Sequence, residues 1–125
     1  MLSMSPKKIR STNPELVKLI RLLRKKSREN KAAIWKDLAE RLSKPKRRRI
    51  VVNVSRLNRY TESGDTVVVP GKVLGAGSIK HPIKVAAFAF SEQARLKIVK
   101  AKGKCITIPE LVESNPKGTD VKIIG

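Results

Sequence analysis

The side chains in this sequence that could do chemistry are mostly cations, and they suit the neutralisation of phosphates. The 125 residues include 29 Lys and Arg against 10 Asp and Glu, which gives a net charge of +19. An excess of this size repels itself and opposes compaction unless a polyanion balances it. Residues 1–60 carry 19 of the cations and only 4 of the acids. The sequence therefore predicts that a polyanion binds mainly to the first half of the chain.

The cations of residues 16–28 recur at the spacing of one helix face. The apolar residues of this segment would share one side of the helix: Leu16, Leu19, Ile20 and Leu23. The cations, separated by three, four and three residues, would share the opposite side: Lys18, Arg21, Lys25 and Arg28. Like charges one turn apart cost an isolated helix about 0.2–0.5 kcal/mol per pair, and a solvated face usually interleaves glutamates to avoid this. Because no acidic residue occurs in residues 16–28, the pattern favours phosphate binding over a merely solvated face.

Residues 44–49 form a second cationic segment, in which five of the six residues are basic. Pro45 is expected to end the preceding helix, because proline cannot continue one. A run of this composition is either a targeting signal or an arm that lies along phosphates. Arg56 and Arg59, three residues apart, would extend the basic surface.

Residues that would support catalysis or a cofactor are scarce. One histidine, His81, and one cysteine, Cys105, cannot supply the four ligands of a usual zinc site, and one cysteine cannot form an intrachain disulfide. No Ser-His-Asp set can be argued from the single histidine. The Gly-Lys pair at residues 71–72 lacks the spacing and the following helix of a phosphate-binding loop. Glycines 75 and 77 lack the third glycine and the helix of a dinucleotide site, so we expect them to permit a tight turn or a close backbone approach. We therefore expect no enzyme, no catalytic residue, no metal, no cofactor and no small-molecule substrate.

The scarcity of aromatic residues, 3% of the chain, decides between modes of nucleic-acid binding. Trp35 lies on the apolar stripe of a second helix, so it is expected in the core rather than against a base. Binding to a folded RNA through its backbone and shape therefore fits better than readout of splayed bases. The alternative is a helix-turn-helix DNA-binding regulator built from residues 14–43. In that motif the second helix enters the groove, whereas here the denser basic face is on the first.

The elements that must position these residues follow from periodicity and capping signals. A helix is expected to begin at Asn13-Pro14, residues 27–31 break its pattern, and a second helix follows from about 32 to 43. A strand at 50–53 and a helical turn at 54–60 come next. Beyond that come strands at 67–69 and 72–74 around a Pro70-Gly71 turn, a strand at 83–90, and a helix at 92–101 that Ser91 caps and Gly103 ends. A strand at 106–108, a helical turn at 109–113, a turn at 115–118 and a strand at 121–124 complete the chain. The order predicts a mixed α/β fold.

One domain is expected, consisting of a basic arm (1–13), a helical, strongly basic part (14–60) and a globular scaffold (61–125). No apolar run approaches the roughly 20 residues of a membrane helix. Residues 1–11 lack the apolar core of a secretory signal, which leaves an organellar transit peptide as the alternative to a cytoplasmic protein.

Several blocks resemble a known family. Residues 53–59 (NVSRLNR), residues 64–75 (GDTVVVPGKVLG), residues 83–91 with Ala94 and Ile98, and Asn13-Pro14 with Ile34-Trp35 are similar to the eighteen-e family of archaeal and eukaryotic large-subunit ribosomal proteins. The shorter pattern of residues 72–75, Gly77, residues 90–91, Ala94 and Ile98 also resembles the bacterial large-subunit protein numbered fifteen. The compact length resembles archaeal members.

The resemblance implies a fold, a role and a set of contacts. The fold would be an irregular superhelix of β-β-α units with an N-terminal basic helical extension. The role would be that of a cytoplasmic structural constituent of the large ribosomal subunit, which holds folded 23S-type rRNA, contacts neighbouring ribosomal proteins and supports translation. The expected RNA-binding residues are Lys7, Lys8, Arg10, Lys18, Arg21, Arg24, Lys25, Lys26, Arg28, Lys31, Lys44, Lys46, Arg47, Arg48, Arg49, Asn53, Arg56, Arg59, Lys72 and His81. For His81 a plain structural role remains the alternative to an RNA contact.

Overall fold

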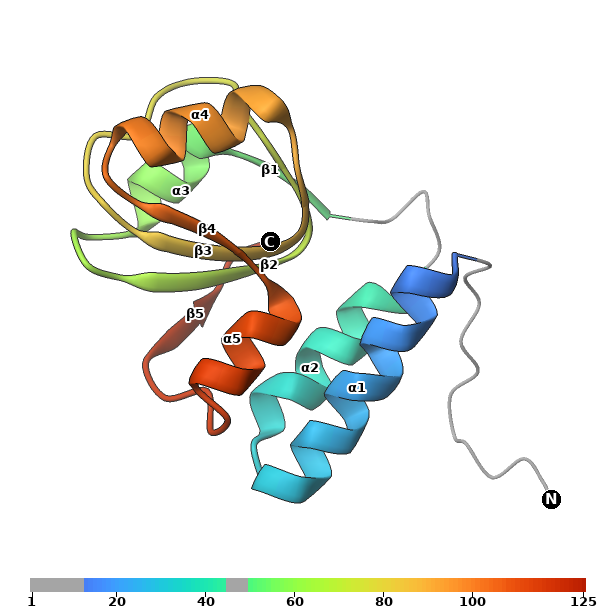
Figure 1. Cartoon of the computed structure of the whole chain (residues 1–125). Coiled ribbons are helices and arrows are strands. Elements are labelled where there is room, and N and C mark those ends of the chain that lie inside the picture. The colour runs from blue at the N-terminus through green and yellow to red at the C-terminus, as the bar shows by residue number, and fades with distance from the viewer. Residues whose placement is uncertain (1–12, 45–49) are drawn as a thin grey trace, which may run out of the picture.

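A computed structural model describes residues 13–44 and 50–125 of the chain. Within these ranges there are five helices and five strands, so the predicted mixed α/β fold is confirmed. The helices are α1 (Pro14–Asn30), α2 (Ala33–Leu42), α3 (Val54–Tyr60), α4 (Glu92–Lys100) and α5 (Ile108–Ser114) (Figure 1). The strands are β1 (Ile50–Asn53), β2 (Thr66–Leu74), β3 (Lys84–Phe90), β4 (Lys104–Thr107) and β5 (Val121–Ile123). The expected basic arm, apart from Asn13, and residues 45–49 of the basic run lie outside the described residues.

The described strands form one parallel sheet with β2 at its centre. On one edge β2 pairs with β3, and β4 pairs with the far edge of β3. The other edge of β2 is divided between two strands from opposite ends of the chain. The last strand, β5, pairs with residues 66–68 of β2, and the first strand, β1, pairs with residues 71–74.

Both faces of the sheet are covered, because successive residues of a strand point to opposite sides. Val68 of β2 packs into a cluster with the buried faces of α1, α2 and α5. Its neighbours Val67 and Val69 pack into a second cluster that includes Leu57 of α3 and Ile98 of α4. Figure 1 shows the two groups of helices on opposite sides of the strands. The order β2–β3–α4 is a β-β-α unit of the kind that the family resemblance implies.

The expected turn at Pro70-Gly71 is wrong. β2 runs through both residues as one strand, and only its register opposite β3 shifts, between Val69 and Lys72. Gly71 is paired with Ile50, and a Cβ at Gly71 would overlap the carbonyl oxygen of Ile50. The Pro-Gly pair therefore serves an irregularity in the strand and a close approach of β1, rather than a reversal of the chain.

Capping signals in the sequence predicted several helix ends correctly. Asn13 caps α1, and Ser91 caps α4 by accepting the backbone N–H of Ala94 at 3.1 Å. The expected break at residues 27–31 is too early, since α1 continues to Asn30 and only Lys31 leaves the helical conformation, at φ 52°.

Two boundaries near the end of the chain also differ from expectation. The left-handed residue after α4 is Lys102, at φ 69°, rather than Gly103. Gly103 instead allows a close approach, because a Cβ there would overlap the carbonyl oxygen of Ile83. Ile108 was expected in a strand but begins α5, since Thr107 at the N-cap and Glu110 in the first turn form a capping box around it.

Candidate nucleic-acid interface

The solvent-facing side of α1 carries the cationic face that the spacing predicts. Leu16, Leu19, Ile20 and Leu23 are all buried against α2, α5 and the sheet. Because these residues occupy one side of the helix, Lys18, Arg21, Lys25 and Arg28 project from the other, and all four are exposed. The expectation of one cationic face on this helix is therefore confirmed in its geometry.

Part of this face is neutralised by an acid just beyond the acid-free stretch. Glu29 forms ion pairs with Lys26 at 3.2 Å and with Lys25 at 3.9 Å. By contrast, Lys18, Arg21 and Arg28 form no ion pair with any residue of the described ranges. These three side chains, which we call the α1 cationic face, are the positions on α1 best placed to bind phosphates.

A second basic surface lies on α3, across the sheet from α1. Val54 and Leu57 are fully buried and hold the short helix against the sheet. Arg56 and Arg59 are exposed on its outer side, beside the exposed ring of Tyr60. Figure 1 places α3 and α1 on opposite sides of the strands. The structure therefore divides the expected RNA-binding residues between two separate surfaces instead of joining them in one.

Asn53 and His81 are both engaged within the protein. The Asn53 side-chain oxygen accepts the backbone N–H of Ala76 at 3.2 Å. The buried hydroxyl of Thr61 lies 2.6 Å from the carbonyl oxygen of Leu57 and 2.7 Å from Nε2 of His81. A hydroxyl has one proton, which Thr61 donates to Leu57, so Nε2 of His81 carries the proton that Thr61 accepts. These contacts give Asn53 and His81 structural roles in tying loops to α3.

The remaining expected residues are spread over other elements. Lys31 and Lys44 are exposed near the two ends of α2, and Arg24 is half-buried on α1. Lys72 is exposed on β2, where it pairs with the exposed Val51 of β1. Lys7, Lys8, Arg10, Lys46, Arg47, Arg48 and Arg49 lie outside the described residues.

The loop that follows β2 is held by a lysine whose role the sequence analysis missed. Nζ of Lys97 on α4 donates to the carbonyl oxygens of Gly75 at 2.6 Å and Gly77 at 2.5 Å. The carbonyl oxygen of Ala76, between them, accepts the backbone N–H of Ser55 at 3.2 Å. A Cβ at Gly77 would overlap Ser55, so the predicted close backbone approach at these glycines is confirmed. No local pattern marks Lys97, because its partners lie about 20 residues away.

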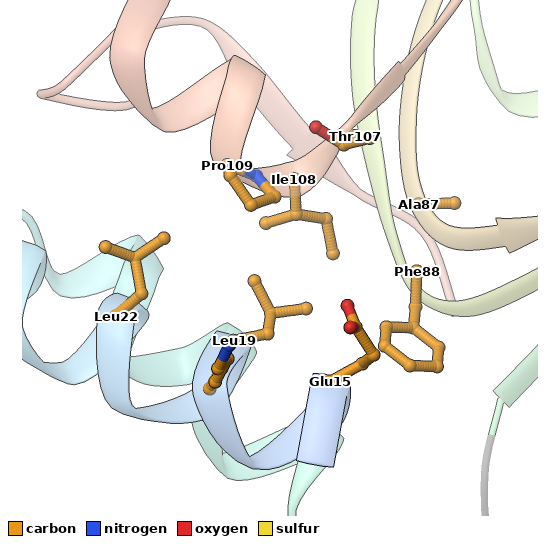
Figure 2. A pocket seen from close by; sticks show the side chains of 9 residues that line it. Glu15, Leu19, Leu22, Ala87, Phe88, Thr107, Ile108 and Pro109 are labelled. Atoms are coloured by element: carbon orange, nitrogen blue, oxygen red, sulfur yellow. The ribbon is translucent and has the colours of Figure 1, made fainter. Parts of the chain in front are cut away.

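An apolar groove of about 420 Å³ borders the α1 cationic face. Figure 2 shows Leu19 and Leu22 of α1 facing Phe88 of β3 and Ile108 of α5 across it. Lys18 lines the same groove. The lining offers hydrophobic contact and few polar groups, so it lacks the convergent polar side chains of a catalytic pocket.

Groups suited to metal binding or nucleophilic chemistry do not gather in the part of the chain that the structure describes. No group of three His, Cys, Asp or Glu residues there could hold a metal ion. Burial raises the pKa of the Cys105 thiol, which favours its unreactive protonated form. Among the described residues no helix is both long enough and apolar enough to cross a membrane.

Comparison with known proteins gives these surfaces a context. Residues 3–125 match the family described as ribosomal protein 60S L18 and 50S L18e. The chain belongs to this family. The resemblance to this family inferred from the sequence blocks is thereby confirmed, and L18e membership makes the chain a ribosomal protein rather than an enzyme.

Archaeal relatives are similar over nearly the whole chain. The large ribosomal subunit protein eL18 of Methanothermobacter thermautotrophicus is 52% identical over 118 residues, which cover 94% of this chain and 98% of that protein. The eL18 protein of Methanococcus maripaludis is 52% identical over the same shares. That of Archaeoglobus fulgidus is 51% identical over 116 residues, which cover 93% of this chain and 99% of the relative.

Proposed function

We propose that this L18e-family chain is a structural constituent of the large ribosomal subunit in the cytoplasm, and that it binds and stabilises folded 23S-type rRNA through its basic N-terminal half. Its family and the names of its relatives support the assignment to the large subunit, and the α1 cationic face supports binding to RNA. Neighbouring ribosomal proteins complete its set of partners. In this role the chain supports translation without a cofactor, a metal or a small-molecule substrate.

The single observation that carries the rRNA proposal is the exposed, unpaired state of Lys18, Arg21 and Arg28 on a rigid helix. Each phosphate that such a side chain neutralises releases a condensed counterion, so binding is strong at low salt and weakens as salt rises. The burial of the opposite side of α1 fixes these three cations in one row without the entropy cost of ordering a flexible arm.

The helix-turn-helix alternative receives less support. That motif presents its second helix to the DNA groove. The exposed and half-buried side of α2 mixes Lys36 with Asp37 and Glu40, and Arg41 pairs with Asp37 at 3.0 Å. A surface of mixed sign suits solvent or a protein neighbour better than a groove lined with phosphates. Family membership also favours the ribosomal role.

The test replaces the α1 cationic face with Lys18→Gln, Arg21→Gln and Arg28→Gln in one chain. Glutamine keeps helix propensity, and all three positions are exposed, so the fold is retained. Binding to transcribed large-subunit rRNA is measured at a series of KCl concentrations. We expect the slope of log K against log salt to flatten by about 2 to 3, at about 0.7–0.9 per phosphate contact.

The matched control is a second triple variant, Lys100→Gln, Lys104→Gln and Lys117→Gln, which removes three exposed cations from the other half of the chain. It should leave the slope near that of the unmodified protein. Equal slopes for the two triple variants would contradict the assignment to α1. In addition, the unmodified protein should co-sediment with large subunits in a sucrose gradient, and recovery only as free protein would overturn the proposed function.

We also propose that the basic run at residues 44–49 lies along phosphates as an arm. Changing Lys46, Arg47, Arg48 and Arg49 to alanine should then flatten the salt dependence by several units. An unchanged slope would mean that the run acts elsewhere, for instance as a targeting signal.

A further inference from the structure

Tyr60, the last residue of α3, is the most exposed aromatic side chain of the protein. The sequence contains four aromatic residues, all within the described ranges. Trp35 is fully buried, and Phe88 and Phe90 are partly buried, whereas 55% of Tyr60 is exposed. A ring left open to water on an otherwise polar surface is a common site of contact with a partner.

Two guanidinium groups lie over this ring, near the outer limit of cation–π distance. Cζ of Arg56 and Cζ of Arg59 each lie 5.9 Å from the centroid of Tyr60. Arg56 precedes Arg59 by three residues and Tyr60 by four, so both of them neighbour Arg56 on the outer surface of α3. We call Arg56, Arg59 and Tyr60 the Tyr60 platform.

The helix beneath this platform is fixed on several sides. Val54 and Leu57 have no exposed surface, and Oδ1 of Asn58 accepts the backbone N–H of Lys80 at 2.9 Å. The Thr61 hydroxyl, immediately after Tyr60, donates to the carbonyl oxygen of Leu57 at 2.6 Å. The backbone that carries the platform is therefore held in place before any partner arrives, which reduces the entropy cost of binding.

We propose that the Tyr60 platform binds one unpaired RNA base, which stacks on the Tyr60 ring while Arg56 and Arg59 contact the adjoining phosphates. This inference rests on the proposed rRNA-binding function and adds a distinct contact on the side of the sheet opposite α1. It does not reverse the expectation that the protein reads RNA mainly by shape, since a single ring accommodates a single splayed base.

The chemistry of the platform favours RNA over a protein partner. An unpaired nucleotide offers both a flat π face for the ring and anionic oxygens for two guanidiniums within a few ångströms of each other. The exposed apolar residues of α4 offer no exposed ring: Leu96 is 64% exposed and Val99 is 57% exposed. The ring near them, over which Arg95 lies at 5.1 Å, is that of the partly buried Phe90. Leu96 therefore provides a matched control for the loss of exposed apolar surface.

The test compares Tyr60→Ala, Tyr60→Phe and Leu96→Ala for binding to large-subunit rRNA, after circular dichroism has verified the fold of each. Alanine at position 60 should weaken binding about 5- to 100-fold, because base–aromatic stacking is lost, and should leave the salt slope unchanged. Phenylalanine keeps the ring and should bind within about twofold of the unmodified protein. The Leu96 variant should bind as the unmodified protein does.

A second readout reports stacking directly. In Tyr60→Trp the new indole should lose fluorescence when RNA is added, because a stacked base quenches it. The unmodified protein, whose only tryptophan is the buried Trp35, supplies the baseline. Emission from the new indole that RNA leaves unchanged would overturn the inference.

The outcomes separate this inference from the function on which it rests. If Tyr60→Ala binds RNA as tightly as the unmodified protein while the α1 triple variant binds weakly, the platform falls and the rRNA function stands. Loss of binding in Tyr60→Phe as well would assign the effect to the hydroxyl and overturn the stacking. If the unmodified protein fails to bind the rRNA, both proposals fall together.

Discussion

Trp35 joins α2 to the turn before β5 through a single side chain. Its ring is fully buried, and its Nε1 donates to the carbonyl oxygen of Pro116 at 2.7 Å, across 81 residues of sequence. The ring also lies beside Gly118, in the turn that leads to β5. The apolar spacing of α2 predicted that this residue is buried, but the partner of its N–H is a distant backbone group that no local pattern reveals.

We expect Trp35→Phe to lower the free energy of unfolding by about 1–3 kcal/mol, since it removes this hydrogen bond and part of the ring. Trp35→Ala should cost about 3–5 kcal/mol because it leaves a large cavity. Urea denaturation followed by far-ultraviolet circular dichroism measures both, independently of tryptophan fluorescence. Equal stabilities of the two variants would mean that packing of the ring adds nothing.

Asp65 and Lys122 make one part of the stability depend on pH. The backbone N–H of Glu62 and then the Lys122 ammonium, 2.9 Å away, hold the pKa of Asp65 below its ordinary value of 3.8. A carboxyl whose pKa is lower in the folded state stabilises the protein at pH values above its pKa in the unfolded state. That contribution to stability disappears as the pH falls through the pKa of the folded state.

The difference in melting temperature between the unmodified protein and Asp65→Asn should therefore shrink as the pH falls below 3.8. Glu113→Gln is the control, because the exposed Glu113 forms no ion pair with any residue in the described ranges. Scanning calorimetry between about pH 7 and pH 2.5 follows both variants. A melting-temperature difference for Asp65→Asn that stays constant over this pH range would rule out a stabilising role for ionised Asp65.

The elements differ in how far local sequence determines them. The caps at Asn13 and Ser91 and the apolar period of α1 act within a few residues, so the sequence predicted these helices well. The Pro70-Gly71 pair has the local signature of a turn, but β2 continues through both residues, where it pairs with β1 on one edge and β3 on the other. Pairing between strands decides such a segment, and the sequence alone does not specify which strands meet.

The connection after β2 provides a test at this scale. Gly77 has a φ of +86°, and a Cβ there would also overlap Ser55 at the start of α3. Gly64 has a similar φ of +89° but open space around it. We expect Gly64→Ala to cost about 1–2 kcal/mol from backbone conformation alone, and Gly77→Ala to cost about 1–3 kcal/mol more from overlap.

Urea denaturation of the two variants measures this difference. Ser55→Gly removes the side chain that a Cβ at Gly77 would meet, so it should recover most of the extra cost when combined with Gly77→Ala. Equal losses for the two alanine variants, or no recovery in the double variant, would show that the overlap relaxes freely.

At the scale of the whole molecule, the sheet divides the positive charge. The sequence predicted the cationic face of α1 because it is a property of one helix. The position of α3 on the other side of the sheet follows from the pairing of β1 with β2, which is not a local feature. For this reason the sequence predicted most of the exposed cations but not their separation into two surfaces.

Two separated surfaces should contribute independently to RNA binding. The α1 triple variant and the pair Arg56→Gln and Arg59→Gln should each weaken binding to the rRNA. Their effects on log K should then add when combined, because distant sites without shared partners are additive. Hydroxyl-radical footprints should show that each variant loses protection of different nucleotides. A combined effect well below the sum would indicate one shared RNA contact.

The pairing of β5 with the central strand β2 has a consequence for folding during synthesis. Its three residues, Val121–Ile123, complete the edge of β2 that β1 also occupies, and they follow the other described strands in the sequence. During synthesis the N-terminal helices emerge first, while the partners of Trp35 and of residues 66–68 are still inside the ribosome that is making them. The N–H of Trp35 and this edge of β2 therefore gain their partners late, after residues 116–123 have been synthesised and have left the exit tunnel.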